Sequence, residues 1–158
     1  MKAFAAFVVL LMLSFSNAAY AQERYAAIVM DANDMQILEQ DNAHEQRYPA
    51  SLTKMMTLYL VFEELRSGRW SPDTRLIASR NAAQQPPSRL GLRRGNSITV
   101  DQAIRALAVQ SANDVATMIA ESIAGSESRF SARMTQQART LGMVDTHFAN
   151  ASGLPNPN

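Results

Sequence analysis

Cysteine is absent from this 158-residue sequence, and lysine is almost absent, occurring only as Lys2 and Lys54. The lack of cysteine excludes disulfides, thiolate metal sites, a cysteine nucleophile and a lipidated N-terminal cysteine. Neither sign of charge dominates, since 15 Lys and Arg residues face 14 Asp and Glu residues, so we expect no nucleic-acid partner. With 47% hydrophobic and 18% charged residues, the composition excludes disorder, collagen and coiled coil.

Long apolar runs are missing except near the N-terminus, where Lys2 precedes the uncharged stretch Ala3 to Phe15. That stretch is shorter than the roughly 20 residues of a spanning helix, and Ala19-Tyr-Ala21 is a small-x-small cleavage pattern. We therefore expect residues 1–21 to be a signal peptide cut after Ala21, and residues 22–158 to be exported. Loss of Lys2 leaves 14 basic and 14 acidic residues, so the mature net charge is zero.

The first half of the mature chain predicts a hairpin and a helix. Two short apolar runs, 25–30 and 36–39, flank turn-forming residues at 31–34, which predicts a β-hairpin. Two strands do not make a stable sheet alone, so this hairpin needs further partners. A mostly apolar helix follows from Pro49 to Leu65 and ends at Gly68; such a helix is expected to be largely buried.

The second half predicts a surface excursion followed by helices. We expect two short strands, at 75–78 and 89–92, joined by a polar loop. Capping residues then open two helical stretches, and loop signals fill the last residues. The predicted features are a capping box at Thr99 and Gln102, an interruption at 110–114, a cap at Ser126 and a helix end at Gly142.

Chemistry is suggested first by Ser51-Leu-Thr-Lys54, at the start of the apolar helix. A three-residue spacing places the Ser51 hydroxyl and the Lys54 amine on neighbouring parts of one helix face. Serine needs an adjacent base to act as a nucleophile, and lysine is a base only if desolvation or positive neighbours lower its pKa. The apolar helix and the positive end of its dipole offer both causes, and the Ser51 N–H could stabilise an oxyanion.

A structural alternative to this catalytic interpretation remains open. Thr53, Lys54, Thr57 and Glu64 lie within about 100° on a helical wheel of 3.6 residues per turn, so Lys54 could border a solvated polar stripe.

A second motif, Ser111-Ala-Asn113, lies in the interruption between two helical segments. Ser and Asn there could simply cap the next helix. In the functional interpretation, Ser111 relays a proton from Lys54 to a leaving amine. Asn113 then offers an amide donor to a substrate carbonyl and an acceptor to the lysine.

Together these motifs resemble those of the exported D-alanyl-D-alanine carboxypeptidases, the low-molecular-weight penicillin-binding proteins of peptidase family S11. The resemblance covers roughly residues 24–158. Four segments carry it in order and spacing: Tyr48-Pro-Ala-Ser-Leu-Thr-Lys-Met-Met56, Leu90-Gly-Leu92, Ser111-Ala-Asn-Asp-Val-Ala116 and Asn150-Ala-Ser-Gly-Leu-Pro155.

The resemblance implies an α+β fold of the β-lactamase/transpeptidase type, an antiparallel sheet flanked by helices. Of this fold, residues 22–158 would supply the first hairpin and the helical lobe. It also implies a periplasmic bacterial enzyme that removes the terminal D-alanine from peptidoglycan stem peptides ending in D-Ala-D-Ala. Ser51 would be the acyl-ester nucleophile, Lys54 the general base, Ser111 the proton relay and Asn113 a substrate-binding residue. β-Lactam antibiotics would be inhibitors, and no cofactor or metal is implied; His44 and His147 are expected to be loop residues.

The family's third motif, Lys-Thr/Ser-Gly, does not occur in this sequence. In the family its strand binds the substrate carboxylate and supplies the second oxyanion donor. We therefore expect the native protein to continue past Asn158 with this strand; only such a C-terminal segment could bring membrane association. Two alternatives remain: a serine β-lactamase, and a non-catalytic penicillin- or peptidoglycan-binding module or inactive truncated relic. Neither Glu121 nor Glu127 has the Asn four residues on that the β-lactamase base motif needs.

Overall fold

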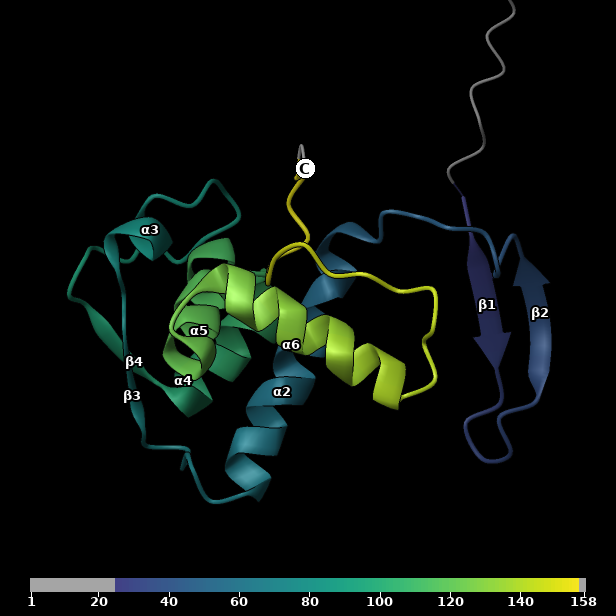
Figure 1. Ribbon diagram of the computed structural model, residues 1–158, viewed down its shortest axis with the longest axis horizontal. Helices are drawn as coiled ribbons and strands as arrows, with labels where there is room; N and C mark the ends of the chain where they lie inside the picture. The colour runs from purple at the N-terminus through teal and green to yellow at the C-terminus, as the bar shows by residue number, and fades with distance from the viewer. Residues whose placement is uncertain (1–24, 157–158) are drawn as a thin grey trace, which may run out of the picture. The chain divides into compact units, whose positions relative to one another are not determined.

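The computed structural model describes residues 25–156, so the predicted signal peptide lies outside the described residues. The chain divides into two compact units, Met1–Arg47 and Tyr48–Asn158. Each unit contains its own two-stranded sheet (Figure 1). Among residues 25–156, none of the helices combines the length and the apolar character needed to cross a bilayer.

The described part of the first unit is the predicted β-hairpin. β1 (Ala27–Met30) pairs antiparallel with β2 (Ile37–Asp41), and the register shifts between Val29 and Met30. In the turn, Asp31 Oδ1 accepts a hydrogen bond from the Asn33 N–H at 2.7 Å. Five apolar side chains of these strands stay exposed, as expected for a sheet of only two strands; they are Ile28, Val29, Met30, Ile37 and Leu38.

The second unit is built around α5 (Asn113–Ala124), which packs against α2 (Lys54–Arg66), α6 (Glu127–Thr140) and β3 (Arg75–Ile77). Every residue from 113 to 120 is buried, as in a core helix surrounded on all sides. The other elements are the 3-10 turn η1 (Ala50–Thr53), α3 (Arg80–Ala83), β4 (Ser97–Thr99), α4 (Val100–Arg105) and the π-helical turn η2 (Ala106–Gln110).

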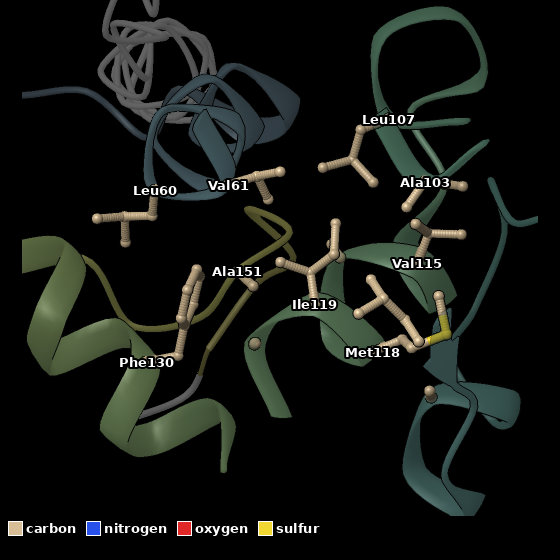
Figure 2. Packing of buried hydrophobic residues seen from close by; sticks show 14 of the residues in the cluster. Leu60, Val61, Ala103, Leu107, Val115, Met118, Ile119, Phe130 and Ala151 are labelled. Carbon is tan, nitrogen blue, oxygen red and sulfur yellow. The ribbon is translucent and has the colours of Figure 1, made fainter. Parts of the chain in front are cut away.

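The core joins elements that are far apart in the sequence. Figure 2 shows side chains of α5, among them Ile119 and Met118, between those of α2 and α6 on one side and those of α4 and η2 on the other. Leu60 and Phe130, from α2 and α6, are both completely buried. Ala151, from the loop that follows α6, is also fully buried within this cluster.

The predicted caps at Thr99, Ser126 and Gly68 are confirmed, whereas the helix predicted from Pro49 starts with the 3-10 turn η1 and becomes α-helical only at Lys54. Thr99 Oγ1 accepts the Gln102 N–H at 3.2 Å and Gln102 Oε1 accepts the Thr99 N–H at 3.0 Å, which completes the capping box. Ser126 caps α6 by accepting the Arg129 N–H. Gly68 follows the C-cap residue of α2 with φ of 74°. These local signals are sufficient because each cap forms within three residues.

The predicted strand at 89–92 is wrong. β3 at 75–77 is confirmed, but it pairs with β4, where Arg75 lies opposite Thr99. The backbone N–H groups of Leu90, Gly91 and Leu92 are instead bound by the carboxylate of Asp114. A strand needs those N–H groups for a ladder, so this contact keeps the segment a loop.

The expectation that the 49–65 helix is largely buried is wrong for one of its faces. Leu52, Met55 and Phe62 are 66%, 68% and 51% exposed, and Tyr59 is 37% exposed. The face turned inward instead combines apolar side chains with polar ones, among them Lys54, Thr57 and Glu64. Three polar residues of this helix, Lys54, Thr57 and Glu64, are thus buried, which bears directly on the candidate site.

Candidate active site

Ser51 lies in η1, the 3-10 turn directly before α2. Its side chain is exposed. The preceding residue, Ala50, has φ of 49°, a left-handed conformation that is costly for alanine. Such strain persists only where surrounding contacts enforce it, and it is common at functional sites.

Lys54 is the first residue of α2 and is 3% exposed. Its Nζ donates a hydrogen bond to the backbone C=O of Ser152 at 2.7 Å. Burial lowers the pKa of this amine from its ordinary value of 10.5, because desolvation disfavours the ammonium form. The expectation that this lysine is desolvated is therefore confirmed.

The alternative that Lys54 borders a solvated stripe is wrong. All four polar residues of that stripe are buried, with exposures of 7%, 3%, 0% and 4% for Thr53, Lys54, Thr57 and Glu64. The physical reason is the loop after α6, whose Ala151 and Ser152 carbonyls accept hydrogen bonds from Thr57 and Lys54. These polar groups are thus turned to the protein interior with partners provided.

Ser111 ends η2 with φ of 55°, and Ala112 follows as the N-cap of α5. The Ser111 Oγ is buried and, among the described residues, has no hydrogen-bond partner. An unpaired buried hydroxyl costs stability and needs an explanation. Ser111 lines the same pocket as Lys54, where a substrate could supply a partner.

Ser51, Lys54 and Ser111 line one pocket of about 490 Å³. Among the described residues, Lys54 is the only one of the lining with a charged side chain. The remaining lining is mainly apolar and comes from the Ser51 segment, α2 and η2: Pro49, Ala50, Leu52, Met55, Leu58, Leu107 and Ala108. Acyl transfer needs a nucleophile, a base and a group that can pass on a proton. This mainly apolar pocket brings together a serine hydroxyl, an amine with a lowered pKa and an unpaired hydroxyl.

Asn113 is placed differently from the other three predicted site residues. It begins α5, is 5% exposed, and is not among the residues that line this pocket. Its Nδ2 donates to the Pro86 C=O at 3.0 Å and its backbone N–H to the Ser88 C=O at 2.7 Å. One amide hydrogen is thus used to fix the 86–88 loop.

Asp114 is a site-supporting residue to which the sequence interpretation assigned no role. Its fully buried carboxylate accepts the backbone N–H groups of Leu90, Gly91, Leu92 and Val115 at 2.9–3.1 Å. This attaches the 90–92 loop to the helix that follows Ser111. In the sequence, an acid directly after Ser-x-Asn is typical of a helix N-terminus. It does not indicate which distant backbone groups the carboxylate binds.

Residues 25–156 contain no cluster of three or more His, Asp or Glu side chains able to hold a metal ion. His44 lies in a turn and His147 in the loop after α6, as expected.

Comparison with known proteins assigns the chain to a family. The model of the peptidase S11 family, described as D-alanyl-D-alanine carboxypeptidase, matches residues 14–158. The chain belongs to peptidase family S11. Among its relatives, D-alanyl-D-alanine carboxypeptidase DacD of Salmonella typhimurium is 37% identical over 151 residues, covering 92% of this chain and 39% of the relative. DacF of Bacillus subtilis is 34% identical over 134 residues, covering 85% of this chain and 34% of the relative.

Solved structures agree with the family assignment. The D-alanyl-D-alanine carboxypeptidase DacD of Francisella tularensis superimposes with a TM-score of 0.81 at 38% identity, covering 84% of this chain and 32% of that one. Penicillin-binding protein D2 of Listeria monocytogenes, in its cefotaxime-bound form, gives a TM-score of 0.71 at 32% identity, covering 84% and 53%. The expected α+β fold of these carboxypeptidases is thereby confirmed, and the chain spans about a third of the length of the curated relatives.

Proposed function

We propose that this protein is a serine-type D-alanyl-D-alanine carboxypeptidase that removes the terminal D-alanine from peptidoglycan stem peptides. The observation that carries the proposal is the single pocket lined by Ser51, Lys54 and Ser111. Family membership favours this activity over a β-lactamase or a binding module. One relative of known structure, penicillin-binding protein D2 of Listeria monocytogenes, has been solved in a cefotaxime-bound and an ampicillin-bound form, which supports β-lactams as inhibitors.

In the acylation step, the neutral Lys54 amine takes the proton of the Ser51 hydroxyl. The Ser51 oxygen then attacks the carbonyl carbon between the two D-alanines. Burial lowers the pKa of Lys54, so a larger fraction of the amine is neutral near pH 7 and available as the base. Backbone N–H groups at the start of the Ser51 segment suit the oxyanion that forms.

In the second half of acylation, the carbon–nitrogen bond breaks and the leaving amine needs a proton. We assign the relay to Ser111: its hydroxyl gives a proton to the leaving nitrogen and regains one from the Lys54 ammonium. The unpaired state of this buried hydroxyl supports the role, because it has hydrogen-bonding capacity free for substrate and lysine. Asn113, whose second amide hydrogen is not used by Pro86, is proposed to bind the substrate carbonyl.

Water then attacks the acyl-ester carbon while Lys54 takes one of its protons. The bond between this carbon and the Ser51 oxygen breaks, the Lys54 ammonium returns the proton to Ser51, and the shortened peptide leaves as the carboxylic acid. A β-lactam would open its ring on Ser51 by the same first step and keep the serine acylated. No step calls for a metal or an organic cofactor. We further propose that residues 1–21 direct export and that the enzyme acts on the cell wall in the bacterial periplasm.

The test is acylation by benzylpenicillin followed by intact-mass and peptide mass spectrometry. We expect one penicillin on the Ser51 peptide, none in Ser51→Ala, and release of D-alanine from an acetylated peptide ending in Lys-D-Ala-D-Ala. An adduct on Ser51 without any D-alanine release would show a binding module. A wild-type chain without an adduct would contradict the acyl-enzyme mechanism.

A further inference from the structure

The loop Asn150 to Leu154 belongs to the motifs singled out in the sequence, but the reaction proposed above gives it no role. It lies in the last described segment, which forms neither helix nor strand. Nevertheless Ala151 and Ser152 are 0% and 2% exposed, and Phe148 just before them is 9% exposed. A loop buried to this degree must have its backbone groups satisfied by specific partners.

Three contacts join this loop to the segment that carries the nucleophile. The Ser152 C=O accepts the Lys54 amine at 2.7 Å, and the Ala151 C=O accepts the Thr57 hydroxyl at 2.7 Å. The third contact is steric: a Cβ atom on Gly153 would lie 1.8 Å from the Ala50 carbonyl oxygen. Only glycine therefore lets the loop approach the strained residue that precedes Ser51.

Asn150 holds the loop in this conformation from within. Its Oδ1 accepts the Gly153 N–H at 2.7 Å, the Ser152 N–H at 3.2 Å and the Ser152 hydroxyl at 3.3 Å. Its Nδ2 donates to the Leu154 C=O at 2.8 Å. One side chain thus makes four hydrogen bonds around the peptide unit whose carbonyl meets Lys54.

We propose that Asn150 is a positioning residue for Lys54, holding the Ser152 carbonyl against the amine and thereby fixing the direction of the amine's other bonds. A neutral amine has two hydrogens and one lone pair. With one hydrogen bound to Ser152, one hydrogen and the lone pair remain for the hydroxyls of Ser111 and Ser51 in the pocket. The use of these two bonds in catalysis rests on the proposed function, whereas the positioning of the amine is a property of the fold.

Few charged groups surround Lys54, so its pKa responds mainly to how well this loop shields the amine from water. Residues 150–156 contain no ionisable side chain, and of the described residues that line the pocket, Lys54 alone has a charged side chain. The carboxylate tied to the loop is Glu127 of α6, whose Oε1 accepts the Ala151 N–H at 3.2 Å. Asp114 of α5 is held by its four backbone donors. Burial therefore dominates the Lys54 pKa, and water admitted by a loosened loop would raise it.

The experiment measures the Lys54 pKa by NMR in protein labelled with ¹³C at the lysine ε carbon. The sequence contains only one other lysine, Lys2, and Lys54→Met assigns the signal. In Asn150→Ala we expect the Lys54 pKa to rise by about one unit, toward the ordinary lysine value. In Asn150→Ser the hydroxyl can still accept a nearby backbone N–H, so the pKa should lie between wild type and the alanine variant.

The matched control is Thr135→Val, which removes a different anchor of the same chain segment. Thr135 Oγ1 accepts the Phe148 N–H at 3.0 Å, and its hydrogen bonds within the described residues go to Ser131 and Phe148 and not to Ser152. The Thr135→Val substitution should lower the melting temperature and leave the Lys54 pKa unchanged. An unchanged pKa in Asn150→Ala, or an equal shift in Thr135→Val, would overturn the proposal. If the alanine variant does not fold, Asn150→Ser decides by the same criterion.

Penicillin acylation of Ser51, measured on the same samples, separates this inference from the proposed function. If wild-type Ser51 is not acylated, the proposed function is contradicted. The Lys54 titration still tests whether Asn150 positions the amine. If acylation proceeds, its pH profile in Asn150→Ala should move to higher pH with the Lys54 titration. A fall in rate without that movement would indicate a structural role only and would overturn the positioning role.

Discussion

The two ends of α2 each bury one charged side chain on the same face, with opposite consequences. Lys54 at the N-terminal end is 3% exposed and Glu64 at the C-terminal end is 4% exposed. The negative charge of Glu64 is balanced by Arg69 and Arg133, which donate hydrogen bonds to both of its carboxylate oxygens. Lys54 has a neutral carbonyl as its partner.

The pKa of each group follows from these partners. Hydrogen bonds from Arg69, and then Arg133, lower the pKa of Glu64 and keep it charged despite its burial. Desolvation lowers the pKa of Lys54 and favours the neutral amine. A buried charge with counter-charges serves the fold, whereas a buried amine without them is available for proton transfer. The difference between the ends of α2 thus separates a structural residue from the residue that we propose as the catalytic base.

The largest expected effect is on chemistry at the N-terminal end. Replacing Lys54 by methionine keeps the length of the side chain and removes the base, so acylation of Ser51 should slow by about 10²- to 10⁴-fold. The free energy of unfolding should stay within about 1 kcal/mol of wild type, because a desolvated amine and one hydrogen bond disappear together. Stopped-flow acylation and urea denaturation measure the two quantities. A variant that acylates at the wild-type rate would remove Lys54 from the mechanism.

At the C-terminal end of α2 we expect a loss of stability without a loss of acylation rate. Glu64→Gln removes the charge shared by Arg69 and Arg133, which are 57% and 34% exposed and can turn to water. We expect a loss of about 2–4 kcal/mol in the free energy of unfolding, somewhat less than for a fully buried pair. In the folded fraction, the acylation rate should stay that of wild type.

The pH dependence of stability provides the control for Glu64. Because its pKa is lower in the folded than in the unfolded state, its stabilisation is present above the unfolded pKa and is lost as the pH falls through the folded value. The free energy of unfolding of wild type should therefore fall toward acid pH more steeply than that of Glu64→Gln. Parallel curves would mean that the ion pairs contribute nothing to stability.

The sequence predicted the features that depend on neighbouring residues. Spacings of a few residues predict the hairpin, the caps at Thr99 and Ser126, and the position of Ser51 and Lys54 in the lining of the same pocket. The errors concern partners that arrive from far away in the chain. The loop at 90–92 is held by Asp114, more than twenty residues on. In the polar stripe, Thr57 and Lys54 are bound by carbonyls 94 and 98 residues away.

The smallest expected effect compares two buried hydroxyls, those of Ser111 and Thr117, which both lack hydrogen-bond partners among the described residues. Removing an unpaired buried hydroxyl relieves a desolvation cost, so Ser111→Ala and Thr117→Val should each change the free energy of unfolding by about 1 kcal/mol or less, toward greater stability. Only Ser111 lines the pocket with Lys54. Ser111→Ala should therefore slow D-alanine release, whereas Thr117→Val, buried in the core helix α5, should not. Equal loss of turnover in both variants would mean that the hydroxyls act through packing and would remove the relay role from Ser111.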